Sequence, residues 1–285
     1  MAVIVHTRGN SLPSAPHPIV SQYQEHLRIL KGSEVTARLS SSSVSQKLDG
    51  LQDLHDSTDQ LLQLPIEQQA FGLECNDKHV NDLLEGSLRL LDICSKAKDC
   101  LTQSKESMHE LQSIIRRRRC DETGFTIAGA KYLSSRKIMK KAIRKVLENL
   151  KATKNELVSS SSNKDNNGFS MLKEAEEITL TSLESVLLFI SDPKGHSKQS
   201  RWSVISKLVQ PRRVACNSSE TDTNEFETVD ATLKSLISHK PSSIENFLSH
   251  MENLELCIQD LEIGIEYLSR KLIRNRVTLL NIFSH

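Results

Sequence analysis

The sequence is poor in the residues that usually reveal an activity or a compartment. Aromatic residues make up 4% of its 285 residues, and its six cysteines include no CxxC pair. A disulfide framework or a zinc site would space its cysteines more closely. We therefore expect reduced thiols that mostly fill the core, because free cysteine is among the most buried residue types.

Long apolar runs are also missing. The longest stretches, such as residues 186–190, fall far below the roughly 18 residues that span a bilayer. The N-terminal apolar run, residues 2–5, is too short for the core of a signal peptide. We expect a cytoplasmic protein without a transmembrane helix, and the faint likeness of residues 1–24 to an organelle transit peptide leaves a plastid as the alternative.

The common signatures of catalysis are not present. The sequence has no GxxxxGK(S/T), no GxGxxG after a strand and no HExxH. Its ten histidines are scattered, and the carboxylates of Glu174, Glu176 and Glu177 suggest a solvated helix face. We therefore expect no enzyme, no cofactor and no metal site, with the histidines at the surface or hydrogen-bonded.

What the sequence does contain is apolar residues at helical spacing. Helices are expected at about residues 19–31, 44–64, 83–115, 130–158, 169–190 and 247–282. No segment shows the alternation of a strand. The predicted fold class is all-α, an elongated bundle of long antiparallel helices. A disordered arm, residues 1–17, precedes the helical bundle domain, residues 18–285, and residues 191–224 form a long basic surface connection within it.

The last helix has the strongest pattern, with apolar residues in alternate steps of four and three. They are Phe247, Met251, Leu254, Ile258, Leu261, Ile265, Leu268, Leu272, Leu279 and Ile282. We expect this stripe to be core rather than an oligomerisation seam, because the other stripes of the chain need partners to cover them. Asn275 interrupts it, and lies either near a frayed end or against a polar group inside the bundle.

Charge is balanced overall, at +1, but unevenly placed. Residues 131–158 carry nine basic residues against two acidic ones, and residues 169–192 are acidic. One interpretation is an antiparallel hairpin with complementary rims. The other is a basic amphipathic helix that binds an anionic membrane surface. Its cations would be Lys137, Lys140, Lys141, Arg144 and Lys151. Nucleic acid is not expected, because aromatic residues for base stacking are scarce.

The first residues contain a motif that can build no core. In His6–Pro18, Arg8 lies three residues before Ser11 and Pro13 lies two after it. This spacing predicts a phosphoserine that a 14-3-3-type groove reads. The alternative is an arm that docks on the bundle through Leu12 and the prolines.

A second basic segment, residues 193–219, has six Lys or Arg residues and no acidic one. Trp202, Ile205 and Leu208 would form the apolar edge of a short helix. Its basic flanks would be Arg201, Lys207, Arg212 and Arg213. Three interpretations stay open: docking on the bundle, contact with an anionic membrane, or a calmodulin-like partner.

Several stretches together carry a family resemblance. They are HTRGNSLPSAPHP, LLEGSLRLLDICSKAKDCLTQSKESMHELQSIIRRRR, WSVISKLV and LIRNRVTLLNIFSH. The chain resembles the plant-specific BYPASS-like family, a domain of unknown function. The resemblance implies a helical, non-enzymatic protein of root and shoot development with no catalytic residues to carry over. One departure is Gly9, where members of the family usually have serine.

Two functions follow as hypotheses. The first is a helical interaction or scaffold protein that presents its surfaces to unknown protein partners. The second is a peripheral membrane-associated regulator that uses its basic amphipathic segments.

Overall fold

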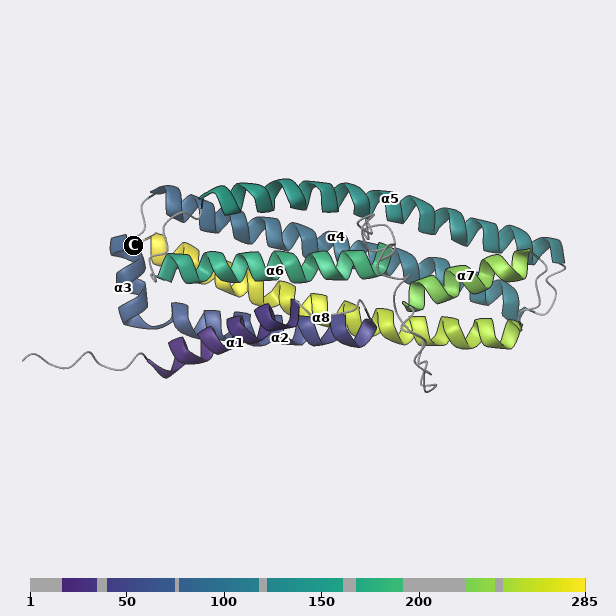
Figure 1. The fold of residues 1–285 in the computed structure, drawn as a ribbon, viewed down its shortest axis with the longest axis horizontal. Coiled ribbons are helices and arrows are strands. Elements are labelled where there is room, and N and C mark those ends of the chain that lie inside the picture. Colours follow the sequence, from purple (N-terminus) through teal and green to yellow (C-terminus); the bar gives the residue numbers. More distant parts are fainter. Residues whose placement is uncertain are drawn as a thin grey trace, which may run out of the picture.

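The computed structural model describes residues 17–34, 40–74, 77–117, 122–160, 168–191, 224–238 and 243–284. Within these ranges the chain forms eight helices and no strand (Figure 1). They are α1 (Pro18–Glu34), α2 (Ser41–Leu62), α3 (Pro65–Glu74), α4 (Asp77–Arg116), α5 (Glu122–Ser160), α6 (Gly168–Ser191), α7 (Glu225–Ile237) and α8 (Ile244–Phe283). The predicted all-α, elongated bundle of antiparallel helices is confirmed. The N-terminal arm lies outside the described residues except for His17.

Three long helices, α4, α5 and α8, run nearly the whole length of the bundle (Figure 1). Helix α8 packs against α2 and α4, and α6 packs against α2 and α4 as well. Helix α5 covers α4 and α6, while α1 covers α2 and α6. At the end of the bundle opposite α3, helix α7 lies against α8 and α5. Helix α5 thus forms one long outer edge of the molecule.

The core is built from the apolar stripes that the spacing predicts. One hydrophobic cluster extends from Tyr23 in α1 to Leu272 in α8, and Leu261 at the centre of the last stripe is fully buried. Ten of the eleven stripe positions of α8 are buried, Asn275 included. In the described chain this stripe is therefore covered by other helices of the same molecule, as predicted.

Local sequence signals explain several helix ends. The Ser40 hydroxyl caps α2 by accepting from the backbone N–H of Ser43. Helix α3 begins at Pro65, because proline is well suited to a first helical turn. Helix α1 continues through Gly32 and ends at Glu34, three residues beyond the predicted boundary at residue 31. Helix α2 begins at Ser41, three residues before the predicted start at residue 44.

Helices α6 and α7 meet where the long connection leaves and re-enters the bundle. The Asn224 side chain accepts from the N–H of Phe226 at 2.8 Å and donates to the carbonyl oxygen of Phe189 at 2.5 Å. One buried amide therefore caps the start of α7 and binds the last turn of α6. The edge-to-face rings of Phe189 and Phe226, 5.7 Å apart, strengthen the junction.

Two short helices, α3 and α7, are absent from the sequence-based prediction. Helix α7 had a readable signal, since Asn224 precedes an acidic first turn and Phe226, Val229 and Leu233 follow at helical spacing. Helix α3 has little periodicity. Only its Phe71 is fully buried among the side chains described there.

Candidate interaction surface

Two of the predicted sites cannot be placed in the structure. Arg8, Ser11 and Pro13 lie outside the described residues, as does the whole of the second basic segment. The same holds for its Arg201, Trp202, Ile205, Lys207 and Leu208. The phosphoserine and tryptophan hypotheses therefore stay predictions.

The basic residues of α5 divide into two groups. Four are bound within the molecule: Lys131 to Glu110, Arg136 and Lys140 to Asp230, and Lys154 to Glu184. The other five are exposed, and none has an ion-pair or hydrogen-bond partner within the part of the chain that the structure describes. These five are Lys137, Lys141, Arg144, Lys145 and Lys151, and we call them the basic face of α5.

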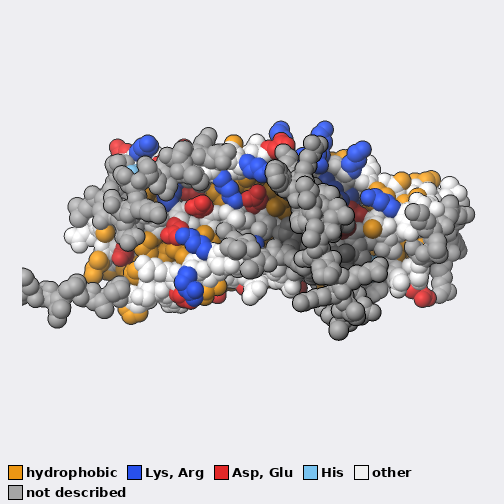
Figure 2. Space-filling model, viewed as in Figure 1, with side chains coloured by type: hydrophobic (Ala, Val, Ile, Leu, Met, Phe, Trp, Pro, Cys, Tyr) orange, Lys and Arg blue, Asp and Glu red, His pale blue; other side chains and the backbone are white. Residues whose placement is uncertain are grey.

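The basic face points away from the bundle because of its register on the helix. Met139, Ile143, Leu147 and Leu150 are buried, and the five cations occupy the opposite side of the same turns. Figure 2 shows Lys and Arg side chains projecting along the edge of the molecule that α5 forms. Lys140, predicted as part of this surface, is instead half-buried and donates to Asp230 at 2.9 Å.

The surroundings of the basic face are short of negative charge. Glu148 is the one acidic residue between positions 123 and 154 of α5. Two large apolar side chains are also exposed on this helix, Ile127 at 66% and Ile138 at 64%. The outward side of α5 therefore combines unpaired cations with isolated apolar groups.

The predicted pairing of charges between α5 and α6 is wrong for most of the acidic residues of α6. Helix α5 does pack against α6, but the acidic residues of α6 reach three different helices. Glu174 binds Lys31 of α1, Glu176 binds Arg89 of α4, and only Glu184 binds α5. Glu174 and Glu176 therefore pair away from α5, Glu177 is exposed, and the one ion pair between α6 and α5 leaves the basic face without a carboxylate partner.

Arg136 is a buried arginine that joins three helices. Its guanidinium donates to the carbonyl oxygen of Ile190 at 2.9 Å, and its Nε lies 3.4 Å from Asp230 Oδ1. The same guanidinium stacks 4.5 Å over the ring of Phe226. A cation at the last carbonyls of α6 also complements the helix dipole. These bonds account for a side chain that is only 2% exposed.

Glu176 contradicts the expectation of a solvated acidic face, because it is buried. Its carboxylate accepts from Arg89 at 3.0 Å and from Lys173 at 2.9 Å. Gly86 of α4 lies directly against this carboxylate, and a Cβ at that position would collide with it. A side chain at position 86 would therefore displace the Glu176 carboxylate from its place between Arg89 and Lys173.

His55 lies at the meeting point of α2, α6 and α8, where it is fully buried. Thr179 donates its hydroxyl proton to the carbonyl of Ala175, so its oxygen accepts from His55 Nε2 at 3.0 Å. His55 Nδ1 then accepts from the Asn275 amide at 3.1 Å. Burial lowers the pKa of His55 to about 4, so the ring is neutral at pH 7. Asn275 thus pairs with a polar group inside the bundle, one of its two predicted alternatives.

The described cysteines behave as the sequence predicts. Cys94 and Cys257 are buried, Cys100 is half-buried, and all three are free. Burial raises the pKa of the Cys94 thiol to about 12, which keeps the thiol protonated and unreactive. The other three cysteines lie outside the described residues.

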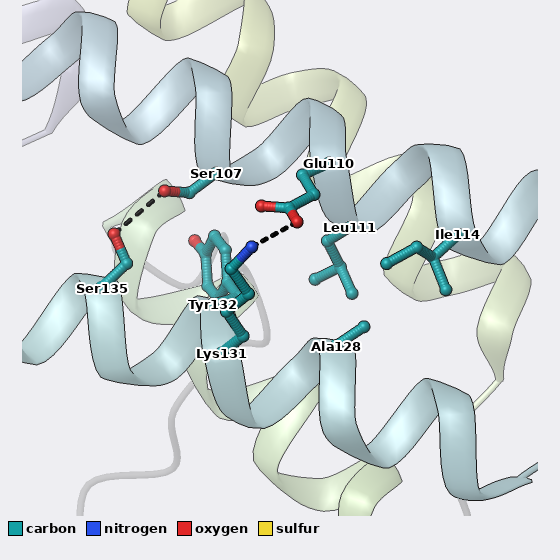
Figure 3. A pocket seen from close by; sticks show the side chains of 8 residues that line it. All are labelled: Ser107, Glu110, Leu111, Ile114, Ala128, Lys131, Tyr132 and Ser135. Atoms are coloured by element: carbon teal, nitrogen blue, oxygen red, sulfur yellow. Dashed lines mark hydrogen bonds and ion pairs between the residues drawn. The ribbon is translucent and has the colours of Figure 1, made fainter.

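A small cavity opens between α4 and α5 (Figure 3). Its volume is about 90 Å³, and its walls mix apolar and polar side chains. The Ser107 and Ser135 hydroxyls are bonded to each other at 3.0 Å across one end, and Lys131 binds Glu110 at its mouth. Ligand pockets usually measure about 300–1,000 Å³, so this cavity has room for a few waters at most.

A second hollow lies where α4 ends beside α8. His109 Nε2 lies 2.9 Å from Glu255 Oε1, and this hydrogen bond lowers the pKa of the Glu255 carboxyl. Arg116 and Arg117 are exposed at the same end. Their place at the end of α4 agrees with the stabilising effect of cations on a helix C-terminus.

Comparison with known protein families shows which family the chain belongs to. A family model described as Protein BPS1 matches residues 47–282, from α2 to the last turn of α8. The chain belongs to the BPS1 family. This confirms the resemblance to BYPASS-like proteins and is consistent with a protein of plant development. No curated protein and no solved structure matches the chain.

In this BPS1-family chain, none of the described helices is both long enough and apolar enough to cross a membrane. The described residues also contain no group of three His, Cys, Asp or Glu side chains arranged to hold a metal ion.

Sequence reasoning placed Lys137, Lys141, Arg144 and Lys151 correctly on the exposed side of α5. It missed Lys145, which the spacing of four from Lys141 could have included. It also missed the buried role of Arg136, although that residue falls on the apolar side of α5, between Tyr132 and Met139.

Proposed function

We propose that this protein is a non-enzymatic helical interaction protein of plant development that binds its partner through the basic face of α5. The observation that carries the proposal is that the five cations of the basic face have no carboxylate partner among the described residues. Within the described part of α5, every other basic residue has a carboxylate partner, whereas these five have none.

The spacing of the five cations works against the helix itself. Lys137, Lys141 and Lys145 follow at intervals of four, and like charges at this spacing destabilise a helix by about 0.2–0.5 kcal/mol per pair. An anionic partner would remove this repulsion. The charge pattern is therefore better suited to the bound molecule than to the free one.

The interior supports a structural rather than a catalytic use of its polar groups. Arg136, Glu176 and His55 each form bonds that tie one helix to another. The cavity between α4 and α5 is smaller than an ordinary substrate pocket, and the larger hollow where α4 ends beside α8 is open to solvent. Both observations favour a protein that acts through its surface.

The test is rescue of a plant line that lacks this protein. The basic-face variant is Lys137→Gln, Lys141→Gln and Arg144→Gln. The matched control is Lys78→Gln, Lys234→Gln and Arg270→Gln, which removes the same charge from exposed positions on other helices. Wild type and control should restore normal growth, and the basic-face variant should not, although it accumulates to the same level and unfolds at the same temperature.

Full rescue by the basic-face variant would overturn the proposal. So would equal failure of the two variants, because the effect would then follow total charge rather than the surface of α5.

A further inference from the structure

We infer that the partner of the basic face is an anionic phospholipid surface. This inference rests on the proposed function and names the chemistry of its partner. It starts from the shape of the surface that the five cations occupy.

The cations form a row rather than a cluster. Lys137 and Lys151 are fourteen residues apart on one helix, which corresponds to about 21 Å along the axis. Successive turns separate them by about 5 Å, so they are placed to meet several phosphates side by side. A single phosphate group would call for cations that converge on one point.

The row can reach a plane without obstruction. Helix α5 is an outer edge of the elongated bundle, and its buried side faces α4, α6 and α7 (Figure 1). A long convex edge of this kind can lie lengthwise on a flat surface. All five side chains can then contact it at once, together with long flexible stems that extend their reach.

The exposed isoleucines fit the same partner. Ile138 lies between Lys137 and Lys141 in sequence, and Ile127 is on the same side of the helix three turns earlier. Apolar side chains beside a basic row enter the boundary between headgroups and acyl chains. Neither isoleucine would gain much from an acidic peptide that only pairs with the cations.

The aromatic residues of α5 argue against single-stranded nucleic acid as the partner. They are Phe125, which is half-buried, and Tyr132, which is buried. Base stacking needs exposed rings, and the described part of this helix offers none.

The expected strength is that of a reversible peripheral contact. Each Lys or Arg near an anionic membrane strengthens binding about fivefold, and Glu148 offsets one of the five. Removing three cations should therefore weaken binding by about 100-fold. The contact should also weaken with salt, since membrane surface charge is screened within a Debye length.

The experiment is co-sedimentation of the full chain with phosphatidylcholine vesicles, with and without phosphatidylserine. Wild type and the control variant Lys78→Gln, Lys234→Gln, Arg270→Gln should bind only the anionic vesicles. The variant Lys137→Gln, Lys141→Gln, Arg144→Gln should lose about 100-fold in affinity at unchanged unfolding temperature. Ile138→Ser should lose a smaller amount that added salt does not change.

Three outcomes would overturn the inference. The first is that the wild-type protein does not bind anionic vesicles. The second is that the basic-face variant binds them as well as the control variant does. The third is that the wild-type protein binds soluble polyglutamate instead of vesicles. Each leaves the plant rescue result untouched. A basic-face variant that fails to rescue while wild type ignores vesicles would keep the proposed function and assign it a protein partner.

Discussion

His55, Glu176 and Arg136 are each buried, and each forms hydrogen bonds or ion pairs that cross to another helix. A buried polar group without such partners costs about 1–3 kcal/mol, and more if it is charged. The interhelical partners of His55 and Glu176 lie 87 to 220 residues away in sequence. Each of these residues therefore fixes which helices are neighbours rather than merely filling space.

Acid should destabilise the protein through His55. The pKa of this ring is about 4 in the folded state against an ordinary 6.5, so only the unfolded chain takes up a proton as pH falls between these values. The contribution of His55 is complete above pH 6.5 and is lost progressively down to pH 4, by roughly 3 kcal/mol in all.

Urea unfolding at pH 7 and at pH 4.5 measures this loss. His55→Gln should be less stable than wild type at pH 7 but should show a smaller further loss at pH 4.5. His17→Gln, at an exposed position, should keep the wild-type pH dependence. An unchanged pH dependence in His55→Gln would contradict the neutral buried ring.

At the scale of elements, the clearest feature is the junction between α6 and α7. Asn224 links the two helices because its side chain is hydrogen-bonded to both. The arrangement brings together two helix ends, Ser191 and Glu225, that are 34 residues apart in sequence. The connection could be read from its composition, but the closeness of its ends could not, since a side-chain bond between distant segments leaves no local pattern.

Replacing Asn224 should loosen α7. Asn224→Ala removes both bonds and should destabilise the protein by about 1–2 kcal/mol. Asn224→Ser keeps an acceptor for the N–H of Phe226, although its side chain is too short to reach Phe189, and should lose less. Hydrogen exchange of the α7 amides, with α4 amides as the internal reference, measures the effect. Wild-type exchange in Asn224→Ala would show that the junction does not hold α7.

For the whole molecule, the fold depends on α8 being covered along its length. Its stripe faces α2 and α4 over most of the bundle, and Leu261 at its centre has no exposed surface. A carboxylate at this position would be buried without a partner, which is among the most damaging of single substitutions. Total stability of a domain is about 5–15 kcal/mol, so such a change can exceed half of it.

Leu261→Asp should therefore unfold the monomer. Circular dichroism should show loss of helix or of cooperative melting, and gel filtration should show an expanded chain. The control is Ile263→Asp, two residues along the same helix, where the side chain is 69% exposed and the fold should survive. A folded Leu261→Asp monomer that has merely lost self-association would identify the stripe as an oligomerisation seam.

The six longer helices, α1, α2, α4, α5, α6 and α8, follow from the sequence alone. Apolar spacing of three and four is a local property of the sequence. It therefore predicts which side of a helix is buried without knowledge of its neighbours, as it does for Leu83 to Ile115 and for Phe247 to Ile282. The all-α class, the core stripe of α8 and four members of the basic face are readable in this way.

The pairing of charges was decided only by the tertiary structure. Lys137 and Lys140 look alike in the sequence, yet Lys140 meets Asp230 of α7 while Lys137 faces solvent. Glu174 and Glu176 likewise pair with α1 and α4, which neither the apolar spacing nor the charge pattern indicates. An ion pair depends on which distant segment packs alongside, and helical periodicity says which side is buried but not what covers it. The cations of the basic face of α5 are those that this packing leaves without a carboxylate partner.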